Sequence, residues 1–85
     1  MARQLPTVRY DKEADAIYVH LHDGRAVRTQ FMDDLRMIDV DTDGTVVGIE
    51  FLDVSGGIDL HEVPFRQTVE TLIEPFNFKV LVESP

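Results

Sequence analysis

The sequence predicts an α+β fold, an antiparallel β-meander of about five to six strands with one C-terminal helix packed on one sheet face. Three observations support this prediction: a strictly alternating segment at residues 16–22, a pair of alternating segments around Asp43-Gly44, and a helical apolar stripe after residue 64. A chain of 85 residues normally forms one domain. We therefore expect a single domain over residues 1–85, with a loose N-terminal tail at 1–6 and a helix–strand extension at 58–85.

The first two strands are expected to be joined by an acidic turn. Residues 7–10 have the composition of a short strand, and residues 11–15 follow as a polar turn. We assign Asp11 and Asp15 structural roles there, because aspartate side chains accept hydrogen bonds from nearby backbone N–H groups. Residues 16–22 then alternate between two faces. The inward set is Ile17, Val19 and Leu21, and the outward set is Tyr18, His20 and His22.

The clearest strand pair surrounds Asp43-Gly44. A tight turn at Asp23-Gly24 and a third strand over residues 26–32 precede it, and its two strands are residues 35–41 and 45–52. We predict that Asp43 and Gly44 form a two-residue turn, because a three-residue loop would mix aliphatic and charged side chains on both faces. The resulting register pairs Val40 with Val47, Ile38 with Ile49, and Arg36 with Phe51.

A helix is predicted over residues 64–74. Proline suits a first helical turn, and a proline also disfavours helix in the residue before it, so Pro64 and Pro75 mark the two ends. The apolar stripe of this helix is Phe65, Val69, Leu72 and Ile73, and a last strand follows at residues 78–82. The stripe needs an apolar sheet face to cover, which gives a predicted core of Ile17, Val19, Leu21, Ile38, Val40, Val47, Ile49 and Phe51.

The composition excludes several classes of function. Sixteen acidic residues against eight basic ones give a net charge of −8, which repels phosphate backbones and argues against direct nucleic-acid binding. The same imbalance either keeps a small protein soluble or provides an acidic surface for a basic partner. The absence of cysteine excludes disulfides, thiolate catalysis and cysteine-ligated zinc. With no apolar run of membrane-spanning length and no signal peptide expected, we predict a cytoplasmic protein that does not bind membranes.

The segment Asp39–Glu50 matches the spacing of a calcium-binding EF-hand loop. Oxygen ligands are required at positions 1, 3, 5 and 12 of such a loop, with glycine at position 6. The matching residues are Asp39, Asp41, Asp43, Glu50 and Gly44. An EF-hand loop lies between two helices, however, and the segments on both sides of this one alternate as strands do. We therefore interpret the segment as an acidic hairpin.

Two further groups of residues suggest chemistry. His20 and His22 lie on one predicted strand face, and Asp23 or His61 would complete a metal site; the alternative is an exposed strand face where histidines are ordinary occupants. Asp11, Glu13 and Asp15 include the carboxylates that acid–base catalysis uses, but turn formation explains them better. Neither group indicates a cofactor.

Two segments carry a family resemblance. "YDKEADAIYVHL" at residues 10–21 and "IDVDTDGTVVGIEFLDVS" at residues 38–55 together resemble domain-of-unknown-function family 2283, a family of small prokaryotic domains, over roughly residues 8–55. The resemblance implies a β-rich fold but no catalytic residues. The resemblance also implies that genes of this kind occasionally lie beside small toxin-like genes, and hence an antitoxin-like or partner-binding role.

These expectations lead to two hypotheses. The first is a non-enzymatic interaction module, antitoxin-like, that uses its acidic surface on a basic protein. The second is a small metal-binding protein or metal-dependent enzyme that uses His20 and His22. A small sheet also has exposed edges, so we expect the chain to form a homodimer.

Overall fold

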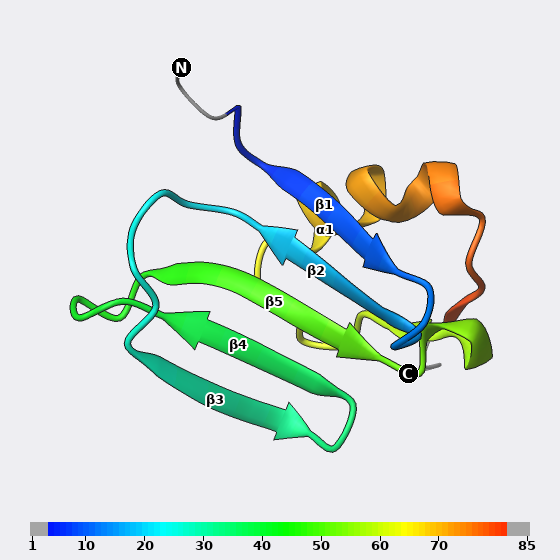
Figure 1. Ribbon diagram of the computed structural model, residues 1–85, viewed down its shortest axis with the longest axis horizontal. Helices are drawn as coiled ribbons and strands as arrows, with labels where there is room; N and C mark the ends of the chain where they lie inside the picture. Colours follow the sequence, from blue (N-terminus) through cyan, green and yellow to red (C-terminus); the bar gives the residue numbers. More distant parts are fainter. Residues whose placement is uncertain (1–3, 82–85) are drawn as a thin grey trace.

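A computed structural model describes residues 4–81, and its central element is a five-stranded antiparallel sheet (Figure 1). Together with a C-terminal helix, this sheet confirms the predicted α+β fold. The strand order is β1-β2-β5-β4-β3. The strands are β1 (Thr7–Asp11), β2 (Ala16–His20), β3 (Arg28–Asp33), β4 (Arg36–Val40) and β5 (Val46–Leu52).

The order of the strands adds one crossover to the predicted meander. β2 pairs with β5, so Ile17 lies opposite Phe51 and Val19 opposite Ile49. This pairing brings the most apolar strands together at the centre of the sheet. Residues 21–27, which include the expected Asp23-Gly24 turn, connect β2 to the far edge strand β3 instead of forming a hairpin (Figure 1).

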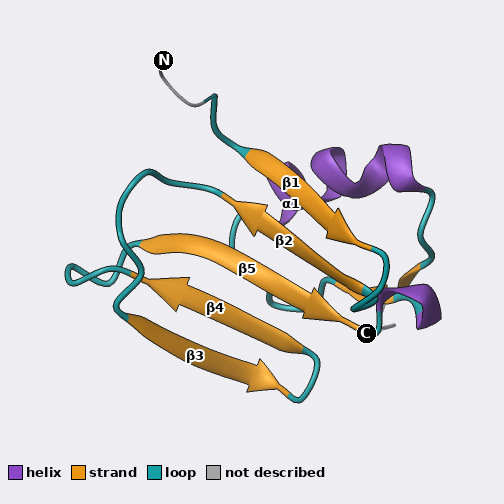
Figure 2. Ribbon diagram, in the orientation of Figure 1, coloured by secondary structure: helices purple, strands orange, loops and turns teal. Residues whose placement is uncertain are grey.

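The rest of the chain forms a cover on one face of the sheet (Figure 2). The 3₁₀ turn η1 (Val54–Gly56) leads to β6 (Ile58–Asp59), which pairs in parallel with β7 (Val80–Leu81), and between them lie helix α1 (Arg66–Ile73) and the 3₁₀ turn η2 (Glu74–Phe76). The helix begins later than predicted because Phe65, its N-cap, has a left-handed backbone with φ of 56°. Pro75 lies within η2, and residue 82 of the predicted last strand and residues 1–3 of the predicted tail lie outside the described residues.

Within residues 4–81 no helix combines the length and the apolar character that crossing a membrane requires.

The core lies between the sheet and this cover. Seven of the eight predicted core residues are buried, and Ile17, Val19 and Ile49 are 0% exposed. The prediction for Ile38 is wrong: it is only half-buried, because its neighbour on β3 is the exposed Gln30 and the cover does not extend that far. Phe65 was also expected to face the core but is 50% exposed, since it precedes the first helical turn. The cover adds Val54, Ile58, Leu60, Val63, Val69 and Ile73 to the core.

The hairpin between β4 and β5 differs from the prediction by one residue. The N–H of Asp41 donates to the carbonyl of Thr45 at 3.0 Å, so the loop has three residues, Thr42, Asp43 and Gly44, and the two-residue turn is wrong. Gly44 has φ of 84°, which favours glycine. A bulge follows, in which Val40 lies opposite Val46, and it restores the predicted pairs of Ile38 with Ile49 and Arg36 with Phe51.

The bulge explains how a three-residue loop keeps the apolar residues on one face. It adds one residue to β5, so that Val47 and Ile49 both remain buried. Strands, not helices, enter and leave the loop, as the hairpin interpretation requires and an EF-hand does not.

Candidate functional site

The face of the sheet opposite the helical cover carries the candidate site. Because side chains alternate across strands, the register identifies the residues on this face. We call it the open face. It consists of three rows across the strands: Arg9, Tyr18, Glu50, Met37 and Phe31; Thr7, His20, Gly48, Asp39 and Thr29; and Asp11, Ala16 and Leu52.

Tyr18 forms the centre of the open face. Its ring lies over Gly48, where an added Cβ would overlap the tyrosine hydroxyl, so this position of the ring requires glycine. The Tyr18 hydroxyl donates to Oδ2 of Asp39 at 3.0 Å, and the Thr29 hydroxyl donates to Oδ1 of the same carboxylate at 2.7 Å. These bonds link β2, β4 and β3 across the open face.

The environment of Tyr18 keeps its hydroxyl protonated. Partial burial, and then the hydrogen bond to Asp39, raises the pKa of Tyr18 to about 12. Both effects disfavour the phenolate, since it would be less hydrated and would face a carboxylate. At neutral pH Tyr18 is therefore a hydrogen-bond donor and a flat apolar surface, not a general base.

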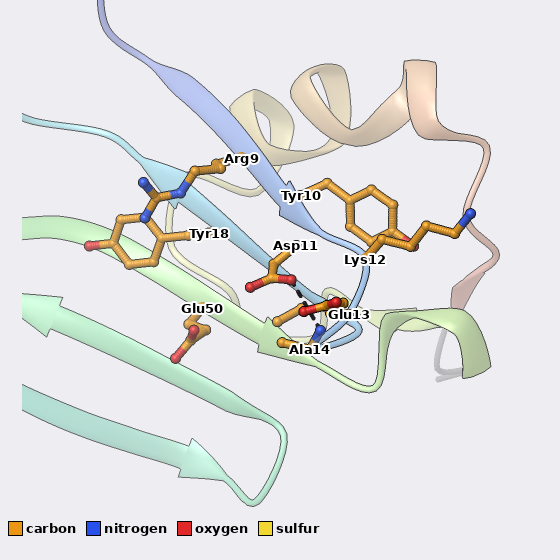
Figure 3. Close-up of a pocket in the computed structure, with 9 residues that line it drawn as sticks. Arg9, Tyr10, Asp11, Lys12, Glu13, Ala14, Tyr18 and Glu50 are labelled. Atoms are coloured by element: carbon orange, nitrogen blue, oxygen red, sulfur yellow. Dashed lines mark hydrogen bonds between the residues drawn. The ribbon is translucent and has the colours of Figure 1, made fainter.

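A shallow hollow of about 590 Å³ lies beside Tyr18 (Figure 3). Arg9 from β1 and Glu50 from β5 line it, and the turn after β1 adds Asp11, Lys12 and Glu13. The Asp11 carboxylate accepts the backbone N–H of Ala14 at 3.1 Å, as Figure 3 shows. The hollow is thus formed by charged side chains of both signs over the ends of three strands.

Both predicted structural acids of the first turn accept hydrogen bonds, Asp11 from within the turn and Asp15 from a residue far along the chain. Asp11 holds the turn through Ala14, and Asp15 has a left-handed backbone with φ of 54°. The Asp15 carboxylate accepts the backbone N–H of Ser55 at 3.0 Å and its hydroxyl at 2.7 Å. Asp15 therefore fastens the β1–β2 turn to the start of the cover, which supports turn formation over acid–base chemistry.

The structure does not bring the predicted metal ligands together. His20 lies on the open face, with its ring 6.2 Å from that of Tyr18. Strand β2 ends there, and His22 turns away: its Nδ1 lies 2.9 Å from the carbonyl oxygen of Val46, and its ring lies 5.5 Å from Phe65 of the cover. Asp23 is exposed in the loop that follows. Among residues 4–81 no three His, Asp or Glu side chains form a group that could hold a metal ion.

Arg36 is an important residue that the sequence analysis did not single out. It is only 8% exposed, and its Nη2 lies 2.9 Å from Oδ2 of Asp33. Its Nη1 donates to the carbonyls of His61 at 2.6 Å and Asp59 at 3.3 Å, which joins β4 to the cover. The guanidinium also lowers the pKa of Asp33. An arginine at an inward position, three residues after an aspartate, was the available signal.

Comparisons with known proteins give one match. The family described as "Protein of unknown function (DUF2283)" matches residues 7–55, which covers β1 to β5, the whole five-stranded sheet, and reaches the start of η1. No curated protein and no solved structure matches the chain. The match ends where the cover begins, so it includes the open face but not the helix.

Proposed function

The chain belongs to the DUF2283 family, and from that premise we propose that it is a non-enzymatic interaction module whose open face binds a basic segment of another protein. This is the kind of role expected of an antitoxin-like protein that docks a basic partner. The whole sheet lies within the family match, and the open face is therefore a feature of the matched region.

The observation that carries this proposal is the composition of the open face. It presents three carboxylates, Asp11, Asp39 and Glu50, against one guanidinium, Arg9. The chain as a whole has a net charge of −8, which also favours the approach of a basic partner. A lysine or arginine side chain is the group that such a surface attracts, and electrostatic attraction mainly speeds association.

The centre of the face suits a protein segment better than a small reactant. Tyr18 is a large, rigid aromatic side chain, of the type enriched at protein interfaces. Its hydroxyl is already engaged with Asp39, which fixes the ring over Gly48. Acidic side chains outnumber basic ones on the lining of the hollow beside it: Asp11, Glu13 and Glu50 against Arg9 and Lys12. A basic side chain placed in this hollow would lie next to the tyrosine face and the carboxylates.

Affinity capture with paired charge-reversal variants tests the proposal. Immobilised wild-type protein is exposed to an extract of the source cell at low salt, and captured proteins are identified by mass spectrometry. Glu50→Lys reverses a charge on the open face, and Glu74→Lys makes the same change in η2, on the helical cover. We expect wild type and Glu74→Lys to capture the same basic protein, and Glu50→Lys to lose it.

High salt should also release the captured protein, because the attraction is between charges. Equal capture by the two variants would place binding elsewhere on the molecule. Failure of the wild type to retain any basic protein at low salt would contradict the proposal itself.

A further inference from the structure

The outer edge of β3 has the features of an unpaired association surface. Within residues 4–81, β3 has β4 as its only strand neighbour. Five of its six side chains are exposed, and Phe31 is 71% exposed, the highest value among the large apolar residues of the described chain. Exposed edge strands present backbone donors and acceptors that another strand can pair with.

The other edge of the sheet is different. Strand β1 lies next to the cover, and its Tyr10 packs edge-on against Phe76 and Phe78, with ring centroids 5.7 and 5.1 Å apart. The aromatic residue of β3, Phe31, has its ring on the open face instead, beside the half-buried Met37. Of the two edges, β3 is therefore the one suited to a second strand.

The charges along β3 favour an antiparallel copy of the same strand. The segment has a basic end, with Arg28, and an acidic end, with Asp33 and Asp34. A strand with opposite charges at its two ends complements itself when it pairs antiparallel. The bulge between Phe31 and Asp33 turns Asp33 toward Arg36, which puts its carboxylate on the same face as Arg28.

We infer that two copies of this chain pair antiparallel along β3, with Gln30 on the two-fold axis, to form one continuous ten-stranded sheet. In this register Thr29 lies opposite the partner's Phe31, and Arg28 lies opposite the partner's Met32, next to the partner's acidic end. The two Phe31 rings are diagonal neighbours, within reach of each other. The pairing uses Arg28–Met32. Pairing with β4 is regular over Arg28–Phe31, and Met32 lies at the bulge where that regular pairing ends. This inference does not rest on the proposed function, and it would join two open faces side by side.

The mass in solution gives the first test. Light scattering over a wide dilution series should give wild type a mass twice that of the 9.7 kDa chain at high concentration. Phe31→Lys removes the aromatic contact and places two like charges near the two-fold axis. The dissociation constant of the dimer should therefore rise on the order of tenfold or more. Phe65→Lys, the same change at another exposed aromatic residue, should leave the wild-type value unchanged. Circular dichroism checks that both variants are folded.

Cross-linking tests the register. The chain contains no cysteine, so a single introduced thiol reports on one position. Gln30→Cys should give a covalent dimer with a short bismaleimide. Each of the two maleimides of this reagent forms a thioether with the cysteine of one copy. Thr7→Cys, on the β1 edge, should remain monomeric under the same conditions. A monomeric wild type, a dimer unaffected by Phe31→Lys, or preferential cross-linking through position 7 would each overturn the inference.

Discussion

One sheet contains two regions with very different surroundings. In the covered half, β1, β2 and β5, the side chains of Ile17, Val19 and Ile49 are 0% exposed beneath the helical cover. In the uncovered half, the β3–β4 hairpin, the same face of the sheet carries the exposed Gln30 and the half-buried Ile38. Figure 1 shows the two halves as neighbouring parts of one sheet. Backbone pairing is continuous across both halves. Hydrogen bonding alone therefore does not distinguish them, and the cover decides where the stability lies.

The uncovered half is attached to the rest of the molecule at a few points. Arg36 connects β4 to the segment at Asp59–His61, and Asp39 connects it to Tyr18 of β2. An isolated two-stranded hairpin is marginal in water, so these attachments and the pairing of β4 with β5 keep the hairpin in place. The same exposure that weakens this half leaves its outer strand available to a second copy.

The largest expected effect on stability is a difference between alanine variants of Ile38 and Ile49, two isoleucines that lie directly opposite each other. Ile49→Ala should lower the free energy of unfolding by about 3–4 kcal/mol, because it opens a cavity under the cover. Ile38→Ala should cost about 1 kcal/mol, since water already reaches that side chain. Denaturant unfolding of both variants measures the difference, and equal losses would mean that the cover does not separate the two halves.

Arg36→Met tests the connection between the halves. It leaves the carbonyls of Asp59 and His61 without their buried donor, which should cost about 2–3 kcal/mol of unfolding free energy. Arg28→Met, in the exposed neighbouring strand, should cost less than about 0.5 kcal/mol. Denaturant titration again compares the two. An Arg36→Met protein as stable as Arg28→Met would show that the guanidinium does not hold the hairpin.

Arg36→Met should also change how the unfolding free energy depends on pH under acidic conditions. The lowered pKa of Asp33 means that its carboxylate adds stability at pH values above the ordinary aspartate pKa, and that this stability is lost as the pH falls through its folded value. Without Arg36 the pKa of Asp33 returns toward its ordinary value. Unfolding free energy should therefore depend less on pH below about pH 4 in Arg36→Met than in wild type.

Two alanine variants, at Asp41 and at Asp43, test the loop that joins β4 to β5. Asp41 Oδ1 accepts the backbone N–H groups of Asp43 and Thr45, both at 2.9 Å. Asp41→Ala should therefore cost about 1 kcal/mol. The Asp43 side chain is exposed, and Asp43→Ala should change stability by less than about 0.5 kcal/mol. Thermal or denaturant unfolding separates them, and a larger loss at Asp43 would contradict this description of the loop.

The smallest effect concerns Tyr18, which joins the two halves on the open face. Its pKa of about 12 when folded exceeds its ordinary value of 10.0, so the unfolded chain releases the proton first. Stability should fall as pH rises from about 10 to 12, by about 1 kcal/mol after allowance for solvent screening. Tyr18→Phe should remove this part of the pH dependence. A variant with the same alkaline slope as wild type would show that another group is responsible.

The central strands of the sheet, β2, β4 and β5, could be predicted from sequence because their signal is local. Ile17, Val19 and Leu21 alternate within one strand, and Ile38–Val40 and Val47–Phe51 alternate on both sides of a turn. The errors arise where an element distant in sequence determines the burial or the pairing of a residue. The burial of Ile38 depends on how far the cover extends, and the three-residue loop is compatible with the pattern only because a bulge follows it.

The candidate site was less predictable for the same reason. His20 and His22 share a face only if the strand continues, and β2 ends at His20. Tyr18, Gly48 and Asp39 come from three strands whose order was not evident, so no local pattern placed the tyrosine over the glycine. Arg36 has its partners in the cover, far along the chain.

Amide hydrogen exchange, strand by strand and at several protein concentrations, tests the contrast between the two halves most directly. In dilute samples the amides of β2 should exchange slowest and those of β3 fastest among the five strands, and β3 should become more protected as the concentration rises. Equal protection of β2 and β3 on dilution, or β3 exchange that does not vary with concentration, would contradict the account.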